Sequence, residues 1–283
     1  MRRRGAIRVA TCQFPAGGSC RENGRWVWRQ MTAAARRGAD LVHFPECALS
    51  GYPGVDLPDL ERYDWAPLRG ETRAVMELAK RLRVWVVLGS SHRLSGRRKP
   101  HNSLYLIGPD GRVRDRYDKR FCTEGDLRVY TPGGRHVVFE LRGWTCALLI
   151  CFDLRFPELY RDLYRLGARV VFQSFHNARY KGPGIHGQIM RQTLQANAAH
   201  NAMWISAPNS SARFSRWPSV FIGPDGVIAG QLRPNRPGLM VNTVDPDLEY
   251  YDPMKPFRAD VLAGQLHTGQ LVQDPRLDDR NSL

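Results

Sequence analysis

The stretch LLICFDLRFPELYR, residues 148–161, decides the fold class of this chain. It begins as an apolar run typical of a buried β-strand, and at Cys151 it changes to acidic, basic and aromatic residues. Pro157 then lies near the start of a helical pattern over residues 156–168, where its missing N–H does no harm. A buried strand that leads into a helix is typical of α/β proteins, and such strand ends commonly carry sites. Taken alone, Cys151 fits a buried structural thiol better than a nucleophile.

Strands and helices alternate on both sides of this stretch. Strand-like runs cover residues 6–12, 41–46, 84–93, 169–175 and 203–209, and helical spacing covers residues 21–40, 71–83 and 185–202. Two Gly-Pro-Asp-Gly segments, at 108–111 and 223–226, each separate two strand-like runs and predict β-hairpins. Helices and hairpins between strands favour an α/β sandwich with mixed β-sheets over a purely parallel sheet or barrel.

The bulk composition predicts one globular domain followed by an arm. The chain has 283 residues, of which 42% are hydrophobic and 24% charged, so it has enough apolar material for a full core. From about residue 245 the sequence becomes rich in Pro, Asp and Arg and loses periodicity. We therefore expect one globular domain at residues 1–245 and an extended C-terminal arm at residues 246–283.

The apolar runs, the cysteines and the charge argue against several classes of protein. No apolar run reaches the roughly 18–20 residues of a membrane span, and the charged start MRRRGAIRVATCQF leads into a strand, so we expect a cytoplasmic protein without a signal peptide. The six cysteines lack the spacing of a zinc site and are expected to be free thiols. The net charge of +15 is spread along the chain, so we expect no nucleic-acid binding, and the absence of a long apolar run predicts no membrane association.

Three segments each place a reactive side chain where a strand ends. Glu46 follows an apolar run in VHFPECALSGYPG, Lys119 ends a hairpin strand in DRYDKRF, and Cys151 ends the central run. The thiolate is the nucleophilic form of cysteine, so a carboxylate can act as its general base and an ammonium can stabilise the thiolate and a developing oxyanion. The backbone N–H of Phe152 is a second candidate donor to that oxyanion. Glu46 could then return the proton to a leaving amine and later activate water.

Three blocks in this order, FPECALSGYP, RYDKR followed by YTPGG, and LLICFDLRFPELYR, resemble the signature blocks of the nitrilase superfamily of carbon–nitrogen hydrolases. The resemblance runs over about residues 6–245. It implies a four-layer αββα sandwich, a catalytic triad at Glu46, Lys119 and Cys151, and neither a metal nor an organic cofactor. It also implies a homodimer or larger homo-oligomer, in which the C-terminal arm crosses to the partner.

The chain departs from the pattern of this superfamily at several positions. Members often carry a second glutamate after the lysine, for which Glu124 is the preferred residue here and Asp126 the alternative. Phe175 and His176 replace a frequent Pro-Ser-Ala-Trp motif, so we expect both to shape the substrate pocket, although His176 fits a histidine satisfied by local backbone equally well. His200 lies where a glutamate is usual, which weakens any inference about the substrate.

The residues after Cys151 resemble the amidase and carbamoylase side of the superfamily more than the true nitrilases. We therefore expect a cysteine-dependent hydrolase of a small linear amide or N-carbamoyl compound, acting through a thioester. Tyr52 and Phe152 are expected to contact the substrate, and Arg128 and Arg179 in the neighbouring loops hint at an acidic or polar one. A nitrilase or acyl transferase on the same scaffold, and a catalytically inactive binding protein, are the alternatives.

Overall fold

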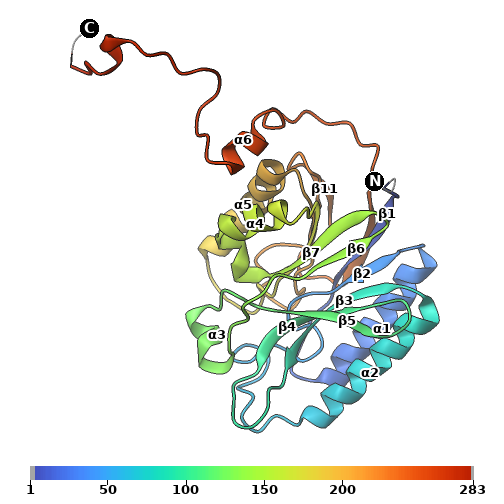
Figure 1. Ribbon diagram of the computed structural model, residues 1–283. Helices are drawn as coiled ribbons and strands as arrows, with labels where there is room; N and C mark the ends of the chain where they lie inside the picture. The colour runs from blue at the N-terminus through green and yellow to red at the C-terminus, as the bar shows by residue number, and fades with distance from the viewer. Residues whose placement is uncertain (1–3, 282–283) are drawn as a thin grey trace. The chain divides into compact units, whose positions relative to one another are not determined.

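The computed structural model describes residues 4–281, and the chain divides into two units between Tyr250 and Tyr251. In the first unit two β-sheets pack face to face, with two helices outside each sheet (Figure 1). These helices are α1 (Cys20–Arg36) and α2 (Trp65–Leu82) on one side, and α4 (Pro157–Arg165) and α5 (Ile185–Asn201) on the other. The second unit contains α6 (Arg258–Leu262) and the 3-10 turn η2 (Pro275–Leu277). The expected division into a domain at 1–245 and an arm at 246–283 stays a prediction.

Both sheets are mixed. When one sheet is read from the opposite edge, the two have the same sequence of parallel and antiparallel neighbours. The first sheet has the order β12-β1-β2-β3-β4-β5, with β1, β2 and β3 parallel and the other neighbours antiparallel. The second has the order β11-β10-β9-β8-β7-β6, with β7, β8 and β9 parallel and the other neighbours antiparallel. The strands are β1 (Ile7–Gln13), β2 (Leu41–His43), β3 (Trp85–His92), β4 (His101–Ile107), β5 (Val113–Asp118), β6 (Val138–Leu141), β7 (Trp144–Ile150), β8 (Val170–Ser174), β9 (Trp204–Ala207), β10 (Val220–Ile222), β11 (Ile228–Gln231) and β12 (Gly238–Val244).

The two Gly-Pro-Asp-Gly segments form the predicted hairpins. They connect β4 to β5 and β10 to β11, so each hairpin forms one edge of a sheet. Gly111 and Gly226 close the two turns with φ angles of +78° and +83°, a conformation that glycine adopts without steric cost. The α/β sandwich of four layers with mixed sheets, expected from the sequence, is confirmed.

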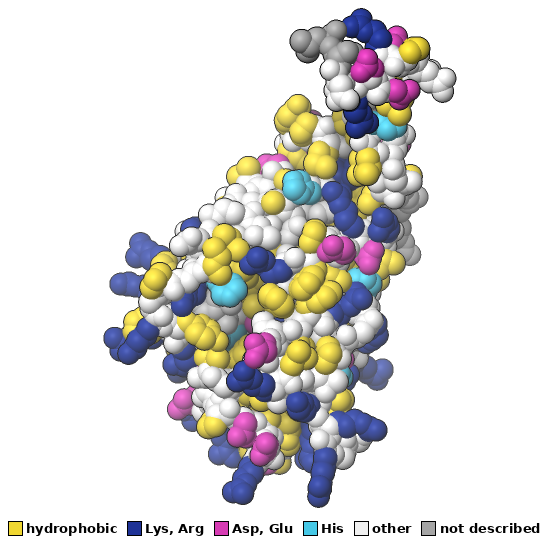
Figure 2. Space-filling view, turned by 90° about the vertical axis from the view of Figure 1, so that its left-hand side faces the viewer, with side chains coloured by type: hydrophobic (Ala, Val, Ile, Leu, Met, Phe, Trp, Pro, Cys, Tyr) yellow, Lys and Arg dark blue, Asp and Glu magenta, His cyan; other side chains and the backbone are white. Residues whose placement is uncertain are grey.

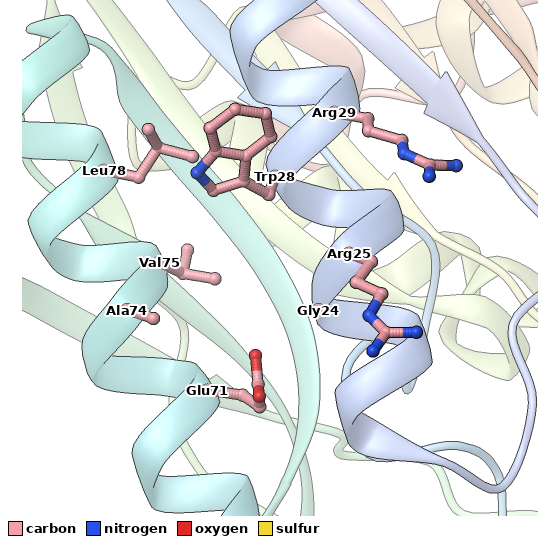
Figure 3. A pocket seen from close by; sticks show the side chains of 8 residues that line it. All are labelled: Gly24, Arg25, Trp28, Arg29, Glu71, Ala74, Val75 and Leu78. Carbon is pink, nitrogen blue, oxygen red and sulfur yellow. The ribbon is translucent and has the colours of Figure 1, made fainter.

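Helices α1 and α2 lie side by side over the first sheet, with a shallow groove of about 230 Å³ between them (Figure 3). Gly24 of α1 permits this close approach, because a Cβ at this position would lie 2.2 Å from Glu71 Oε2 of α2. Trp28 of α1 reaches across the groove toward Leu78 of α2 (Figure 3). The two helices therefore form one continuous outer layer.

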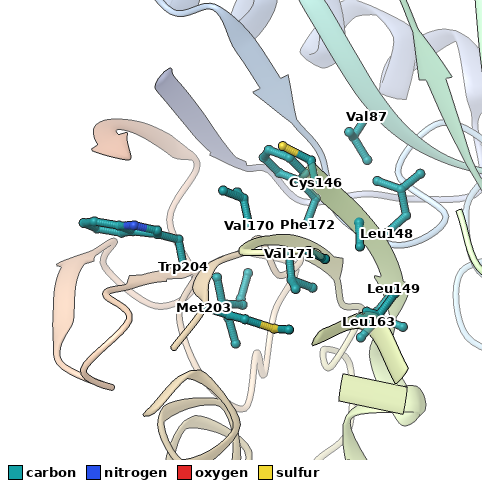
Figure 4. Packing of buried hydrophobic residues seen from close by; sticks show 14 of the residues in the cluster. Val87, Cys146, Leu148, Leu149, Leu163, Val170, Val171, Phe172, Met203 and Trp204 are labelled. Atoms are coloured by element: carbon teal, nitrogen blue, oxygen red, sulfur yellow. The ribbon is translucent and has the colours of Figure 1, made fainter. Parts of the chain in front are cut away.

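Successive side chains of β3 point alternately into the apolar layer between the two sheets and into the layer under α1 and α2. Val87 belongs to the cluster between the two sheets, which also contains Cys146 and Phe172 of the second sheet (Figure 4). Its neighbours Val86 and Leu88 belong to the cluster beneath α1 and α2. Successive side chains of a strand point to opposite faces, so this strand contributes to two apolar layers at once.

A buried histidine joins the two sheets. His43 at the end of β2 is fully buried, with Nδ1 2.9 Å from Ser206 Oγ and Nε2 2.9 Å from Ser174 Oγ. Burial holds the pKa of His43 well below its ordinary value, so the ring is neutral and bonds both hydroxyl groups without a charge. Because Ser174 lies in β8 and Ser206 in β9, this contact fixes the carboxyl end of β2 against the second sheet.

The surface charge is dispersed, as the sequence suggests. Lys and Arg side chains are spread over the whole face seen in Figure 2. Within residues 4–281, no helix combines the length and the apolar character needed to cross a bilayer. The expected cytoplasmic location, the homo-oligomer and the lack of nucleic-acid binding stay predictions.

Candidate active site

Cys151 lies at the point where β7 gives way to the 3-10 turn η1 (Cys151–Arg155). Its φ angle is +42°, which is unusual for any residue other than glycine. Such backbone strain persists where the surrounding structure enforces it, and it is concentrated at functional sites. The side chain is 9% exposed and lies in the wall of a cavity.

Asp153, two residues further on, holds this turn in place. Its Oδ2 accepts hydrogen bonds from Ile150 N at 2.9 Å and from Tyr117 Oη at 2.7 Å, and its Oδ1 accepts one from Phe121 N at 2.9 Å. Burial raises the pKa of Asp153 to about 6 despite these three donors. Because Tyr117 lies in β5 and Phe121 just beyond it, Asp153 joins the Cys151 turn to the segment that carries Lys119.

Lys119 directly follows β5 and is 1% exposed. Its Nζ donates to Glu46 Oε1 at 2.8 Å and to Asp126 Oδ2 at 2.8 Å. Burial alone would favour the neutral amine, but the negative charges at Glu46, Cys151 and Asp126 hold the pKa of Lys119 well above its ordinary value. The ammonium is therefore retained in a fully enclosed position.

Glu46 is completely buried and is fixed by three contacts. Its backbone N donates to Phe175 O at 3.2 Å, and its Oε1 accepts from both Lys119 and Asn102 Nδ2, the latter at 2.8 Å. Within residues 4–281 its other oxygen, Oε2, has no hydrogen-bond partner. Burial and the charge of Glu46 raise the pKa of Cys151 well above its ordinary value, while Lys119 acts in the opposite direction. The side chains at these three strand ends therefore share one site.

Asp126, the alternative to the preferred Glu124, is the carboxylate that lies against Lys119. Helix α3 (Glu124–Val129) begins after Thr123, and Asp126 turns back to accept from Thr123 N at 2.9 Å and from Lys119 Nζ. Tyr52 Oη also donates to Asp126 Oδ1. Burial raises the pKa of Asp126, but Lys119 and Tyr52 lower it by more, so it stays below its ordinary value. Glu124 instead lies in solvent and pairs with Arg128 at 2.9 Å.

The site opens into a cavity of about 330 Å³. It is lined by Tyr52, Lys119, Thr123, Cys151, Phe152, Arg155, His176, Asn177, Tyr180, His186, Met190 and Arg216. Three of the four residues expected to contact substrate, Tyr52, Phe152 and His176, lie in this wall. Phe175 does not, because its ring is fully buried against Trp217, with the ring centroids 4.8 Å apart.

His176, in the cavity wall, contacts the buried side chain of Asp56. His176 Nε2 lies 2.9 Å from Asp56 Oδ2, and both side chains are 0% exposed. Arg179 Nε donates to the other oxygen, Asp56 Oδ1, at 2.5 Å. Burial raises the pKa of Asp56, but His176, the Tyr52 N–H and Arg179 lower it by more. Arg179 is therefore engaged with Asp56, whereas the sequence suggested that it faces the substrate.

Asn177 is a site residue that the sequence did not reveal. Its Nδ2 donates to Cys151 Sγ at 3.7 Å, and its Oδ1 accepts from Trp217 Nε1 at 2.8 Å. Its backbone N donates to Asn209 Oδ1 at 2.7 Å, so both ends of the residue are held. The one signal in the sequence that could have indicated Asn177 is that it directly follows His176, which replaces a motif residue of the superfamily. His200 is exposed in the last turn of α5 and lies outside the residues that line the cavity.

Within residues 4–281, no group of three or more His, Cys, Asp or Glu side chains is arranged to hold a metal ion. The site as described offers instead a thiol, an ammonium, two carboxylates and an amide donor. Such a set can perform proton transfer and nucleophilic attack with its own side chains.

Known proteins similar to this chain include two that are named as amidases. An (R)-stereoselective amidase from a Pseudomonas species is 34% identical over 191 residues, which is 67% of this chain and 62% of that protein. A deaminated glutathione amidase from Synechocystis sp. strain PCC 6803 is 28% identical over 261 residues, which is 84% of this chain and 92% of that protein.

Solved structures show the same fold. The crystal structure of an amidase from Nesterenkonia sp. superposes with a TM-score of 0.76 at 22% identity, over 93% of this chain and 97% of that one. A variant of the Nesterenkonia amidase, with TM-score 0.76 and 21% identity over 91% and 96% of the chains, carries the acetamide moiety of fluoroacetamide covalently added at its active-site cysteine. The sequence matches the carbon-nitrogen hydrolase family over residues 8–253. The chain therefore belongs to the carbon-nitrogen hydrolase family, a family of enzymes that act on carbon–nitrogen bonds other than peptide bonds, as the sequence blocks indicated.

Proposed function

We propose that this chain is a cysteine-dependent amidohydrolase that cleaves a small linear amide or N-carbamoyl compound through a thioester. Cys151 is the nucleophile, Glu46 the general base and acid, and Lys119 the ammonium that stabilises negative charge. The observation that carries the proposal is the contact of Lys119 Nζ with Glu46 Oε1, since Lys119 and Cys151 both lie in the wall of the same cavity. The relatives named as amidases support the same class of reaction.

In the first half-reaction the thiol proton moves from Cys151 Sγ to the unpartnered oxygen, Glu46 Oε2. The sulfur forms a bond to the carbonyl carbon, and the negative charge that develops on the carbonyl oxygen is met by Lys119 Nζ and the Phe152 N–H. When this tetrahedral intermediate collapses, the carbon–nitrogen bond breaks. The leaving nitrogen takes the proton from Glu46 and departs as ammonia or an amine, which leaves an acyl thioester on Cys151.

In the second half-reaction a water molecule attacks the thioester carbon. Glu46 takes a proton from this water, and the second oxyanion is stabilised as the first was. The carbon–sulfur bond breaks, and the sulfur recovers its proton from Glu46. The acid leaves and the site returns to its starting state.

Asp126 and Asn177 support these steps without forming bonds to the substrate. Asp126 accepts a second hydrogen bond from Lys119 beside the one to Glu46, so the ammonium is held by two carboxylates. Asn177 donates to the sulfur and so favours the thiolate over the thiol. Both are positioning residues in this proposal.

The experiment that tests the proposal is a comparison of Cys151→Ala with Cys20→Ala. Cys20 lies in α1, among residues that do not line the cavity, so its variant controls for the loss of a thiol. A panel of amides, ureides and nitriles is screened for ammonia release with each protein. The proposal predicts that wild type and Cys20→Ala hydrolyse an amide or ureide, whereas Cys151→Ala does not. Retained hydrolysis in Cys151→Ala, or turnover of nitriles alone, would contradict it.

A further inference from the structure

Three basic side chains from separate segments line the open part of the cavity. Arg155 ends the turn η1, His186 lies at the start of α5, and Arg216 comes from the loop before β10. Arg155 and His186 are exposed and Arg216 is partly exposed, in contrast to the buried Lys119 and Cys151. These three residues, which we call the basic rim, therefore lie at the solvent side of the cavity.

The members of the basic rim line one cavity, so their positive charges act on one another. Partial burial and the positive charges of Arg155 and Arg216 lower the pKa of His186. None of the residues that line the cavity is Asp or Glu. The rim therefore contributes two permanent positive charges that no acidic residue of the cavity wall offsets.

The two arginines are also without an acidic partner elsewhere in residues 4–281. Arg216 donates to the backbone oxygen of Gly182, and neither it nor Arg155 forms an ion pair with a carboxylate there. Arg179 and Arg128, which the sequence suggested as contacts for an acidic substrate, do have acidic partners: Arg179 pairs with Asp56, and Arg128 pairs with Glu124. Free guanidinium groups match the geometry of a carboxylate, to which they can donate two parallel hydrogen bonds.

The buried end of the cavity has the opposite sign. There the single positive charge of Lys119 faces two carboxylates, Glu46 and Asp126, so the group is net negative when both are ionised. A second carboxylate is repelled from this end and attracted to the rim. The cavity therefore has a built-in polarity that can fix the direction in which a charged substrate enters.

We propose that the substrate is an amide or ureide with a carboxylate at the end remote from the scissile bond, and that Arg155 and Arg216 bind this carboxylate. This inference rests on the proposed hydrolysis at Cys151 and narrows its substrate class. The cavity of about 330 Å³ holds a small molecule, and Phe152, Tyr180 and Met190 provide apolar or aromatic wall between its two ends. An acyl chain of a few carbons can lie along this wall with its amide at Cys151.

The test compares substrates that differ in charge alone. Hydrolysis of glutaric acid monoamide and of its methyl ester, and of N-carbamoylglycine and its methyl ester, is followed as ammonia release. Wild type is compared with Arg216→Gln and Arg155→Gln. Arg213→Gln is the matched control, because Arg213 lies in the same loop as Arg216, is exposed and packs on Phe214, outside the residues that line the cavity.

We expect wild type to prefer an acid over its ester by about tenfold or more in kcat/KM, the value of one charged hydrogen bond. Arg216→Gln and Arg155→Gln lose most of this preference through a higher KM for the acid, while the ester is cleaved within about twofold of wild type. Arg213→Gln behaves as wild type. Equal use of acid and ester by wild type, or a parallel loss of both substrates in the rim variants, would overturn the inference.

A second measurement keeps this inference separate from the proposed hydrolysis. Alkylation of Cys151 by iodoacetamide is measured with added pentanoate or methyl pentanoate, which differ in a single carboxylate. Protection by pentanoate alone, lost in Arg216→Gln, supports the basic rim even if none of the four compounds is hydrolysed. Absence of protection by pentanoate would overturn the proposed carboxylate binding by the rim, while hydrolysis at Cys151 would still be tested by the amide panel.

Discussion

Lys119 Nζ donates to Glu46 Oε1 at 2.8 Å, while Glu46 Oε2 has no hydrogen-bond partner within residues 4–281. The carboxylate thus has one oxygen committed to the ammonium and one free for a proton. A general base needs both an available lone pair and a fixed position, and this pair provides them together. Asn102 adds to this difference between the two carboxylate oxygens, since it donates to the same Oε1 atom as Lys119.

Glu46→Gln separates the two effects of Glu46 on the cysteine. The variant loses the base, so kcat falls by about a thousandfold, within the range usual for general acid–base groups. It also loses the negative charge that raises the pKa of Cys151, so the thiolate forms at lower pH than in wild type. The pH dependence of iodoacetamide alkylation measures this change, with Cys151→Ala as the background for the other thiols. Wild-type turnover, or a midpoint that moves to higher pH, would contradict the role of Glu46.

Asp126→Asn and Glu124→Gln form a matched pair of substitutions two residues apart. Asp126→Asn removes one of the two carboxylates that bond Lys119, so kcat/KM falls about a hundredfold and stability falls by about 1–3 kcal/mol, as for a weakened buried ion pair. Glu124→Gln affects an exposed pair with Arg128 and changes stability by less than about 0.5 kcal/mol. Steady-state kinetics and urea unfolding of both variants check this. The reverse order of effects would show that Asp126 does not support Lys119.

Asn177→Ala tests the amide that donates to the sulfur. Loss of this donor removes a hydrogen bond that favours the thiolate, so the alkylation midpoint of Cys151 rises by about one pH unit and kcat/KM falls about tenfold. Asn242→Ala, in β12, makes the same chemical change at a residue outside the cavity lining and leaves both quantities as in wild type. A fall in kcat/KM with no change in the alkylation midpoint would assign Asn177 a purely structural role.

Asp153 makes stability depend on pH in an unusual direction for a carboxyl group. Its folded pKa of about 6 lies above its ordinary value of 3.8, so the folded state binds this proton more tightly than the unfolded state. The contribution is therefore favourable at low pH and is lost as the pH rises from about 4 to about 6, by about 2–3 kcal/mol in total. The difference in unfolding free energy between wild type and Asp153→Asn, measured by urea at several pH values, isolates this group. A difference that is flat, or that grows in favour of wild type as the pH rises, would contradict it.

The sequence singles out Glu46, Lys119 and Cys151 because each follows a recognisable strand end. Strand ends are fixed by the hydrophobic pattern, and the topology of mixed sheets brings several of them to one place. The choice between Glu124 and Asp126 depends instead on where helix α3 begins. Thr123 is the N-cap, so the third helical residue, Asp126, turns back toward Thr123 and Lys119, while Glu124 at the first position points outward.

Phe175 and Asn177 show a second limit of the sequence. Both follow β8 by a few residues, in a segment without regular secondary structure, and periodicity does not tell which side chain enters the cavity. Their roles depend on Trp217, which packs against the ring of Phe175 and bonds the amide of Asn177. That residue is distant in sequence, and no local pattern connects it to β8.

The most direct test of the central claim is mass spectrometry of the enzyme quenched in acid during the first turnover of an amide substrate. The account predicts an added acyl group on the peptide that contains Cys151, which appears before the acid product and is absent from Cys151→Ala. Turnover by wild type without any acylated Cys151, or an acyl group attached at another residue, would contradict the account.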